Sequence, residues 1–114
     1  MFDRGSQVDS VAVLQCYAKA LELTHAMLEA AKRSDWDRMI VLEKERTRVI
    51  DQLRHLDLDP GRDTQTLSRK RELIRGILQC DEQIQILTQD WMRELREVLG
   101  SIRSEQRLSQ TYES

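Results

Sequence analysis

The chain has 114 residues, of which 39% are hydrophobic and 4% aromatic, and its 18 basic and 20 acidic residues give a net charge of −2. Four glycines and one proline supply few turns, which disfavours an all-β fold and favours long amphipathic helices in one small domain. The near balance of charge disfavours nucleic acid and an anionic membrane surface as partners.

No targeting segment is evident. The chain has no run of about 18 apolar residues, so we expect no membrane insertion. Its polar start, M-F-D-R-G-S-Q-V-D-S, lacks the apolar stretch of a secretion signal, which predicts a cytoplasmic location. In that compartment Cys16 and Cys80, which are far apart in the sequence, are expected to be free thiols.

A first helix is predicted over residues 10–33, after a flexible segment of residues 1–9. Its apolar residues form two stripes at spacings of three and four. One stripe contains Val11, Leu14, Tyr17, Ala18, Leu21 and Leu28, and the other, nearly opposite, contains Cys16, Ala20, Leu23, Met27 and Ala30. A helix that covers one small core needs a single stripe, so the second is interpreted as surplus apolar surface.

The stretch R-S-D-W-D predicts a tight corner between two helices. Ser34 is predicted to cap the second helix, with Asp37 reaching back as in a capping box. Trp36 is predicted to turn toward the neighbouring helix and to fix the corner.

A second helix is predicted over residues 35–56, with a stripe that Glu43, Arg46 and Thr47 interrupt. The stripe contains Trp36, Met39, Ile40, Ile50 and Leu53, and its outer flank contains Leu42, Val49 and Leu56. The turn residues Asp59-Pro60-Gly61 predict the one clear loop.

A third and longest helix is predicted over residues 64–99. A regular spacing of three and four joins Leu67, Ile74, Ile77, Asp81, Ile84, Thr88, Trp91, Leu95, Val98 and Ile102. Asp81 and Thr88 in this stripe either control helix register or anchor a partner peptide. Gly100-Ser101 predicts a break, followed by a mobile helix or tail over residues 100–114.

Together these elements predict an all-α fold, an antiparallel up-down-up bundle of three helices with a core over residues 10–99. The sequence has no glycine-rich phosphate loop, no CxxC pair and no HExxH motif. We therefore expect no cofactor, no metal, no catalytic residue and no enzymatic activity.

The surplus apolar residues predict a protein-binding surface. They are Leu23, Met27, Leu42, Val49, Leu56, Leu78 and Met92. Two alternatives stay open at this point. The surface either receives an amphipathic helix of another protein, or it mediates self-association, as in a homodimer or a coiled-coil structural protein without a role in export.

The chain resembles the FliT family of flagellar export chaperones. The likeness is carried by W-D-R-M-I-V-L-E-K-E-R-T-R-V-I-D-Q-L from Trp36, by L-I-R-G-I-L-Q-C-D-E-Q-I from Leu73, by W-M-R-E-L-R-E-V-L-G from Trp91 and by R-L-S-Q-T-Y before the end. These stretches occur in the family's order and spacing over nearly the whole chain.

The resemblance implies a cytoplasmic, non-catalytic chaperone. Members of the family bind the C-terminal segment of the filament-cap protein FliD, prevent its early assembly and deliver it to the flagellar type III export apparatus. Their partners there include the export ATPase and the export gate protein FlhA, and some members also bind the flagellar master regulator. Tyr112 matches the family's tyrosine that contributes to docking on the export gate.

Overall fold

The computed structural model describes the backbone of residues 3–56 and 63–113 and the side chains of residues 10–56 and 63–109. These residues form α1 (Asp3–Lys32), α2 (Trp36–Leu56) and α3 (Thr64–Glu113), without a strand. The predicted all-α fold is confirmed. The first helix begins at Asp3, within the segment predicted to be flexible, and the predicted turn at 59–61 lies outside the described residues.

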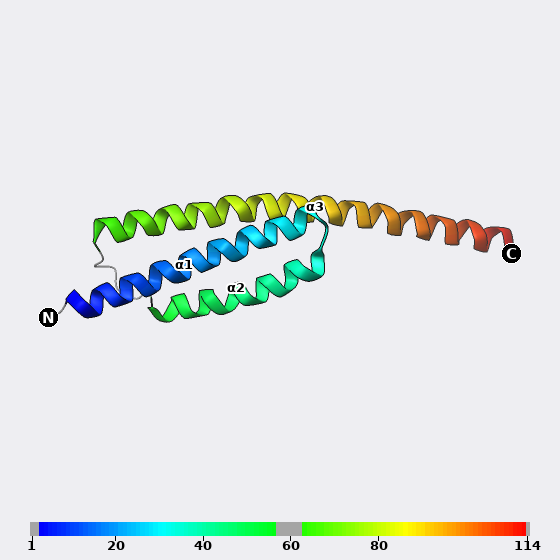
Figure 1. The fold of residues 1–114 in the computed structure, drawn as a ribbon. Helices are drawn as coiled ribbons and strands as arrows, with labels where there is room; N and C mark the ends of the chain where they lie inside the picture. The colour runs from blue at the N-terminus through cyan, green and yellow to red at the C-terminus, as the bar shows by residue number, and fades with distance from the viewer. Residues whose placement is uncertain (1–2, 57–62, 114) are drawn as a thin grey trace. The chain divides into compact units, whose positions relative to one another are not determined.

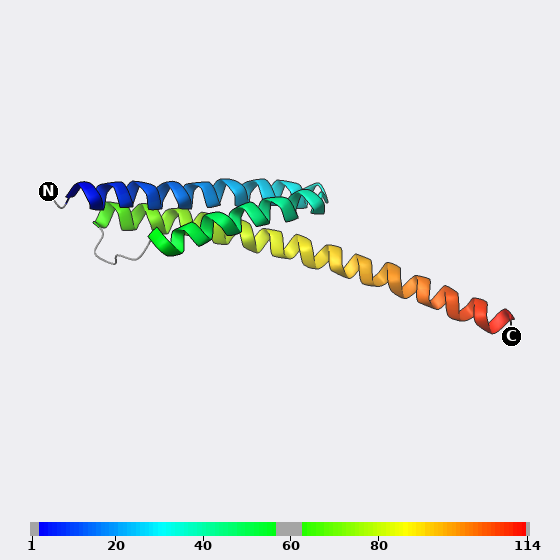
Figure 2. The ribbon, with the colours of Figure 1, turned by 90° about the horizontal axis from the view of Figure 1, so that it is seen from below.

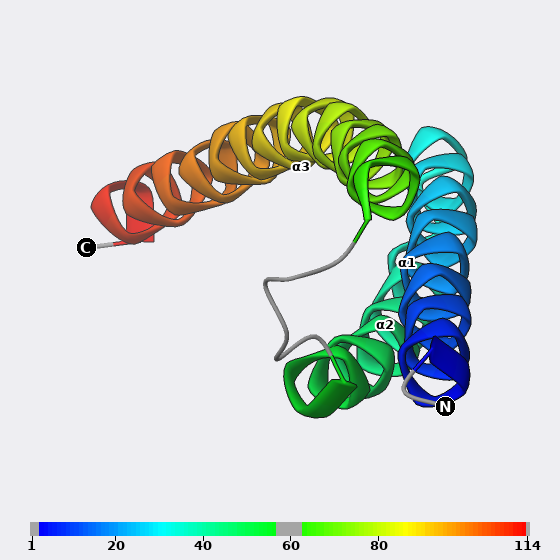
Figure 3. The same cartoon turned by 90° about the vertical axis from the view of Figure 1, so that its left-hand side faces the viewer.

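The chain divides into two units, Met1–Ile84 and Gln85–Ser114. In the first unit, α1 is flanked by α2 and by the first part of α3 (Figures 1 and 3). Figure 2 shows the predicted up-down-up order, because α1 and the first part of α3 run in one direction and α2 returns between them along the chain.

The place of α1 between two neighbours explains its two apolar stripes. Each stripe faces a helix, so the stripe interpreted as surplus belongs to the core. Leu23 and Met27 are only 5% and 3% exposed. The buried apolar side chains of α1 are Val13, Ala20, Leu23, Met27, Leu28, Ala30 and Ala31.

The apolar stripe of α2 is rotated relative to the prediction. Leu42 and Leu53 are 4% and 7% exposed, whereas Ile40 and Ile50 are 46% and 36% exposed. The predicted outer flank is therefore the core-facing side. The buried positions follow a spacing of three and four that passes through Arg46, the residue that was interpreted as an interruption.

The first part of α3 packs closely on α1. A Cβ atom added at Gly76 would lie 3.1 Å from Leu21 Cδ1, so the missing side chain permits the approach. About one turn before Leu21 on α1, the Tyr17 ring has its centroid 5.6 Å from the Lys70 ammonium of α3, within reach of a cation–π interaction. Leu73, Cys80 and Ile84 complete the core from α3.

The corner between α1 and α2 differs by one residue from the prediction. Ser34 has a left-handed φ of 57° and follows the end of α1. The Ser34 amide donates to Ala31 O at 3.0 Å and the Asp35 amide donates to Ala30 O at 2.8 Å, which is the Schellman pattern of a helix C-terminus. Ser34 thus ends the first helix and does not cap the second.

Asp35 is the N-cap of α2. Its Oδ1 accepts from the Arg38 amide at 3.2 Å and its carbonyl accepts from the Met39 amide at 3.1 Å. Asp37 lies in the first turn, where the helix dipole favours a carboxylate, and Trp36 opens the helix with a half-buried indole. Because Ser34 ends α1 and the next residue, Asp35, caps α2, the connection needs no further loop.

Asp63 caps α3 in the same manner. Its Oδ1 accepts from the Thr66 amide at 2.6 Å, and its carbonyl accepts from the Leu67 amide at 3.1 Å. These bonds, chiefly the one from the Thr66 backbone, hold the pKa of the Asp63 carboxyl below its usual 3.8. The start of α3 at Thr64 agrees with the prediction.

In the second unit, α3 continues through Gly100, so the predicted break at Gly100-Ser101 is wrong. A Cβ atom added at Gly100 would meet nothing within 4 Å, and the residue does not adopt a positive φ. A single glycine costs a helix about 1 kcal/mol relative to alanine, which the surrounding glutamate, arginine and leucine residues offset. The helix reaches Glu113 and includes the backbone of Tyr112, whose side chain lies outside the described residues.

Candidate functional site

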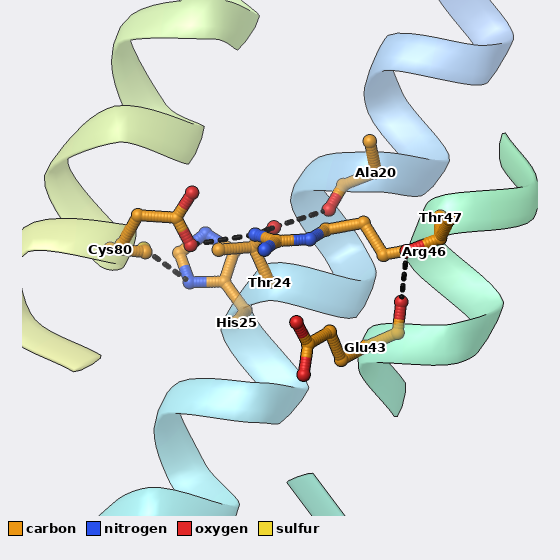
Figure 4. Close-up of polar contacts among 8 residues, drawn as sticks. Ala20, Thr24, His25, Glu43, Arg46, Thr47 and Cys80 are labelled. Atoms are coloured by element: carbon orange, nitrogen blue, oxygen red, sulfur yellow. Dashed lines mark hydrogen bonds and ion pairs between the residues drawn. The ribbon is translucent and has the colours of Figure 1, made fainter. Parts of the chain in front are cut away.

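A polar cluster joins the three helices of the first unit. Arg46 of α2 donates from Nη1 to Thr24 Oγ1 of α1 at 3.1 Å and to Asp81 Oδ1 of α3 at 2.6 Å. The Thr24 hydroxyl in turn donates to Ala20 O at 2.7 Å. Figure 4 shows the Arg46 side chain extending from α2 across Thr24.

Burial makes this cluster more than a surface ion pair. Thr24 is fully buried, and the Arg46 and Asp81 side chains are 16% and 38% exposed. A buried hydroxyl is stable only when it is hydrogen-bonded, and a largely buried guanidinium only when a carboxylate pairs with it. The cluster therefore fixes how α2 and α3 sit on α1. Of the two roles left open for Asp81, this geometry favours control of helix register.

Cys80 and His25 lie close together but do not form an activated pair. Cys80 Sγ lies 3.4 Å from His25 Nδ1. Figure 4 marks this contact between α3 and α1 with a dashed line. Burial, and then the charge of Asp81, raise the pKa of the Cys80 thiol, although Lys32 acts in the opposite direction. A thiol with a raised pKa stays protonated near neutral pH and is a poor nucleophile.

The described part of the chain has neither a cluster of metal ligands nor a membrane-spanning helix. Among its residues, no three His, Cys, Asp or Glu side chains gather closely enough to hold a metal ion. No helix in that part is both long and apolar enough to cross a membrane. What the first unit does present is apolar surface.

The predicted partner-binding residues fall into two groups. Leu23, Met27 and Leu42 are buried at 5%, 3% and 4% exposure, because α1 uses both of its stripes for packing. They cannot contact a partner unless the core opens. Val49 and Leu56 are half-buried at the edge of the core, Leu78 is 62% exposed, and Met92 is half-buried in the second unit.

Exposed and half-buried apolar side chains lie near Arg46 and Asp81 along α2 and α3. Ile50, which is 36% exposed, follows Arg46 by one helical turn on the same side of α2. On α3, Leu78 precedes Asp81 by one turn, and the half-buried Ile74 precedes it by two. We call Ile50, Ile74 and Leu78 the cluster-side patch.

Of this patch, Leu78 was predicted to bind a partner, whereas Ile50 and Ile74 were assigned to the predicted helix stripes. A usable signal was present. A buried arginine requires a carboxylate on a facing helix, so Arg46 and Asp81 could have been paired and the side of each helix assigned from them. Thr88, the other polar residue of the predicted stripe, is half-buried in the second unit.

The chain was compared with known proteins. The family model described as flagellar protein FliT matches residues 14–114, which include most of α1 and all the described residues of α2 and α3. Flagellar protein FliT of Citrobacter koseri is 27% identical over 93 residues, covering 82% of this chain and 75% of that protein. No solved structure matches. With a family match over nearly its whole length, this chain belongs to the FliT family of flagellar proteins, a family of type III export chaperones.

Proposed function

We propose that the chain binds the C-terminal segment of the filament-cap protein FliD in the cytoplasm, prevents its premature assembly and delivers it to the flagellar type III export apparatus. Membership of the FliT family supports this function. The observation that carries it is the cluster-side patch, where the folded first unit leaves Ile50 and Leu78 exposed on two different helices. We propose binding alone, without catalysis.

The patch suits a partner helix for two reasons. Ile50 and Leu78 lie on α2 and α3, on the sides that the Arg46–Asp81 ion pair brings together. An amphipathic helix laid along this line would cover both with its apolar face. The ion pair beneath would hold the spacing of the two helices, so the surface would be formed before the partner arrives.

Delivery is assigned to another part of the chain. We propose that Tyr112, near the end of α3, contributes to docking on the export gate protein FlhA, and that the export ATPase is a further partner. Binding of the flagellar master regulator is a further proposal of the same kind. Docking through Tyr112 is separate in the sequence from the patch, so the two activities should separate by mutation.

The experiment is co-elution of the full chain with a FliD C-terminal segment on a sizing column. Ile50→Ser/Leu78→Ser should abolish co-elution while leaving the far-UV circular dichroism spectrum unchanged. Val41→Ser is the matched control, because Val41 is 50% exposed on α2 and lies about two and a half helical turns from Ile50, on the opposite side. Retention of the segment by the double variant would contradict the proposed surface.

A second arm tests delivery. Tyr112→Ala should still bind the FliD segment but lose capture of the cytoplasmic domain of FlhA, and Tyr112→Phe tests whether the ring alone suffices. If the wild-type chain fails to bind the FliD segment at all, the proposed function is wrong whatever the variants do.

A further inference from the structure

Two arginines border the cluster-side patch on α3. Arg71 and Arg75 are exposed and precede Leu78 by seven and three residues. At 3.6 residues per turn, Arg71 lies within about 20° of Leu78 around the helix axis and Arg75 within about 60°. The side of α3 that carries the 62% exposed Leu78 therefore also carries two guanidinium groups.

Neither arginine is neutralised within the described part of the chain. The ion pairs among the described residues involve other cations. Glu72 lies one turn before Arg75, but it pairs with Arg69 at 3.1 Å. Arg71 and Arg75 also lie four residues apart, a spacing at which like charges destabilise a helix. Both charges are thus available to carboxylates of a partner.

The border of the patch on α2 has no comparable excess of cations. Arg54 follows Ile50 by one helical turn, and its Nη1 lies 3.8 Å from Asp51 Oδ1. Glu43 is exposed and precedes Ile50 by seven residues, which places it within about 20° of Ile50 around the helix axis. The patch therefore has a cationic border on α3 and a border of mixed charge on α2.

This distribution of charge fits one kind of partner helix. Ile50 and Leu78 would contact its apolar face, and guanidinium groups pair with carboxylates, often through two hydrogen bonds at once. A basic border on the partner would instead bring like charges to Arg71 and Arg75, which is unfavourable. Charge complementarity thus favours a partner that is acidic where it faces α3.

We propose that Arg71 and Arg75 select the partner of the cluster-side patch, an amphipathic protein helix with carboxylate side chains along the border that faces α3. The inference rests on the proposed function in taking this patch as the partner's binding site. Apolar contact supplies most of the affinity, and the two arginines discriminate between partner segments by charge. Because both arginines are exposed, the discrimination weakens as the salt concentration rises.

Binding of two synthetic helical peptides to the full chain tests the proposal. Both peptides carry leucines at a spacing of three and four, and one border carries glutamates in the first peptide and lysines in the second. Fluorescence anisotropy at low salt should give a dissociation constant at least about tenfold lower for the glutamate peptide, a preference that shrinks at high salt. Ile50→Ser/Leu78→Ser should abolish binding of this peptide. Equal binding of the two peptides, tighter binding of the lysine peptide, no binding of either, or undiminished binding by the serine variant would overturn the proposal.

Charge reversal assigns the preference to the two arginines. Arg71→Glu/Arg75→Glu should reverse it, so that the lysine peptide binds more tightly, and Arg71→Gln/Arg75→Gln should abolish it. Lys44→Glu/Arg48→Glu is the matched control, because these exposed cations are also four residues apart but lie about 120° or more from Ile50 around α2. A glutamine variant that keeps the preference, or a control that loses it as fully as the reversal variant, would contradict the assignment.

The FliD C-terminal segment is measured beside the peptides, which separates this inference from the proposed function. If the FliD segment binds while the two peptides bind equally, the inference is wrong and the proposed function stands. If the glutamate peptide shows the expected preference while the FliD segment does not bind, the proposed function is wrong and the inference stands.

Discussion

Removing the Asp81 carboxylate tests the polar cluster that joins the three helices. In Asp81→Ala the Arg46 guanidinium, whose side chain is 16% exposed, would lose the partner that lies 2.6 Å away. Breaking a fully buried ion pair costs about 3–5 kcal/mol, and breaking an exposed pair costs at most about 1 kcal/mol. Because the Asp81 side chain is 38% exposed, water can partly replace it, and we expect a loss of about 2 kcal/mol.

The assay is urea unfolding at one protein concentration, followed by far-UV circular dichroism. A loss of about 2 kcal/mol corresponds to a Tm lower by about 8 °C for a domain of this size. Asp90→Ala is the matched control, because its ion pair with Arg93 is 3.1 Å long but lies on one exposed helix surface. It should cost less than about 0.5 kcal/mol.

A double variant separates the loss of the Arg46–Asp81 ion pair from the cost of leaving the Arg46 charge buried without a partner. Arg46→Met/Asp81→Leu removes both charges and fills the space with apolar atoms, so it should be more stable than Asp81→Ala. The reasoning would be refuted if Asp81→Ala were no more destabilising than Asp90→Ala, or if the double variant were less stable than the single one.

Further predictions concern the helix ends and the core. Ser34→Gly should raise the free energy of unfolding by about 0.5–1 kcal/mol, because glycine adopts the left-handed φ without steric cost, and a thermal melt with no gain would contradict the Schellman assignment. Leu42→Ala should cost about 3 kcal/mol in urea unfolding, whereas Ile40→Ala should cost less than about 1 kcal/mol, and equal losses would contradict the orientation of α2. Since Thr66 lowers the pKa of Asp63, the stabilisation from this cap is complete above the ordinary pKa of 3.8 and is lost as the pH falls through the lower folded value. The free energies of unfolding of Asp63→Asn and the wild type should therefore converge at low pH. A difference that stays constant across the acid range would exclude the Asp63 carboxylate as the source of this stabilisation.

The sequence predicted the helices well because their signals are local. The spacing of apolar residues and the turn residues between helices placed α2 and the start of α3 within one residue of their observed bounds. The cap of α2 was placed at Ser34 and not at Asp35, because both residue types are good N-caps and only the left-handed φ of Ser34 separates them. The helix α3 was predicted to break at Gly100 but continues through it, because one glycine costs a long helix little free energy.

The side of each helix that faces the core could not be predicted from periodicity alone. Apolar spacing shows that Leu23 and Met27 share a face, but not that a second helix covers it. For the same reason, Leu42 was predicted on the outer flank of α2 and Ile50 on its core-facing stripe, whereas Leu42 is buried and Ile50 is exposed. Arg46 held the missing information, since its pairing with Asp81 sets the orientation of both helices, yet that pairing links residues far apart in the sequence.

In the proposed function, the cluster-side patch receives the cap-protein segment while the core stays closed. Methyl NMR of the full chain tests this, with isoleucine and leucine methyls labelled and an unlabelled FliD C-terminal segment added. Intermolecular NOEs to the methyls of Ile50, Ile74 and Leu78, with none to Leu23 or Leu42, are the predicted result. Intermolecular NOEs to Leu23 and Leu42, or only to methyls of the second half of α3, would contradict the claim.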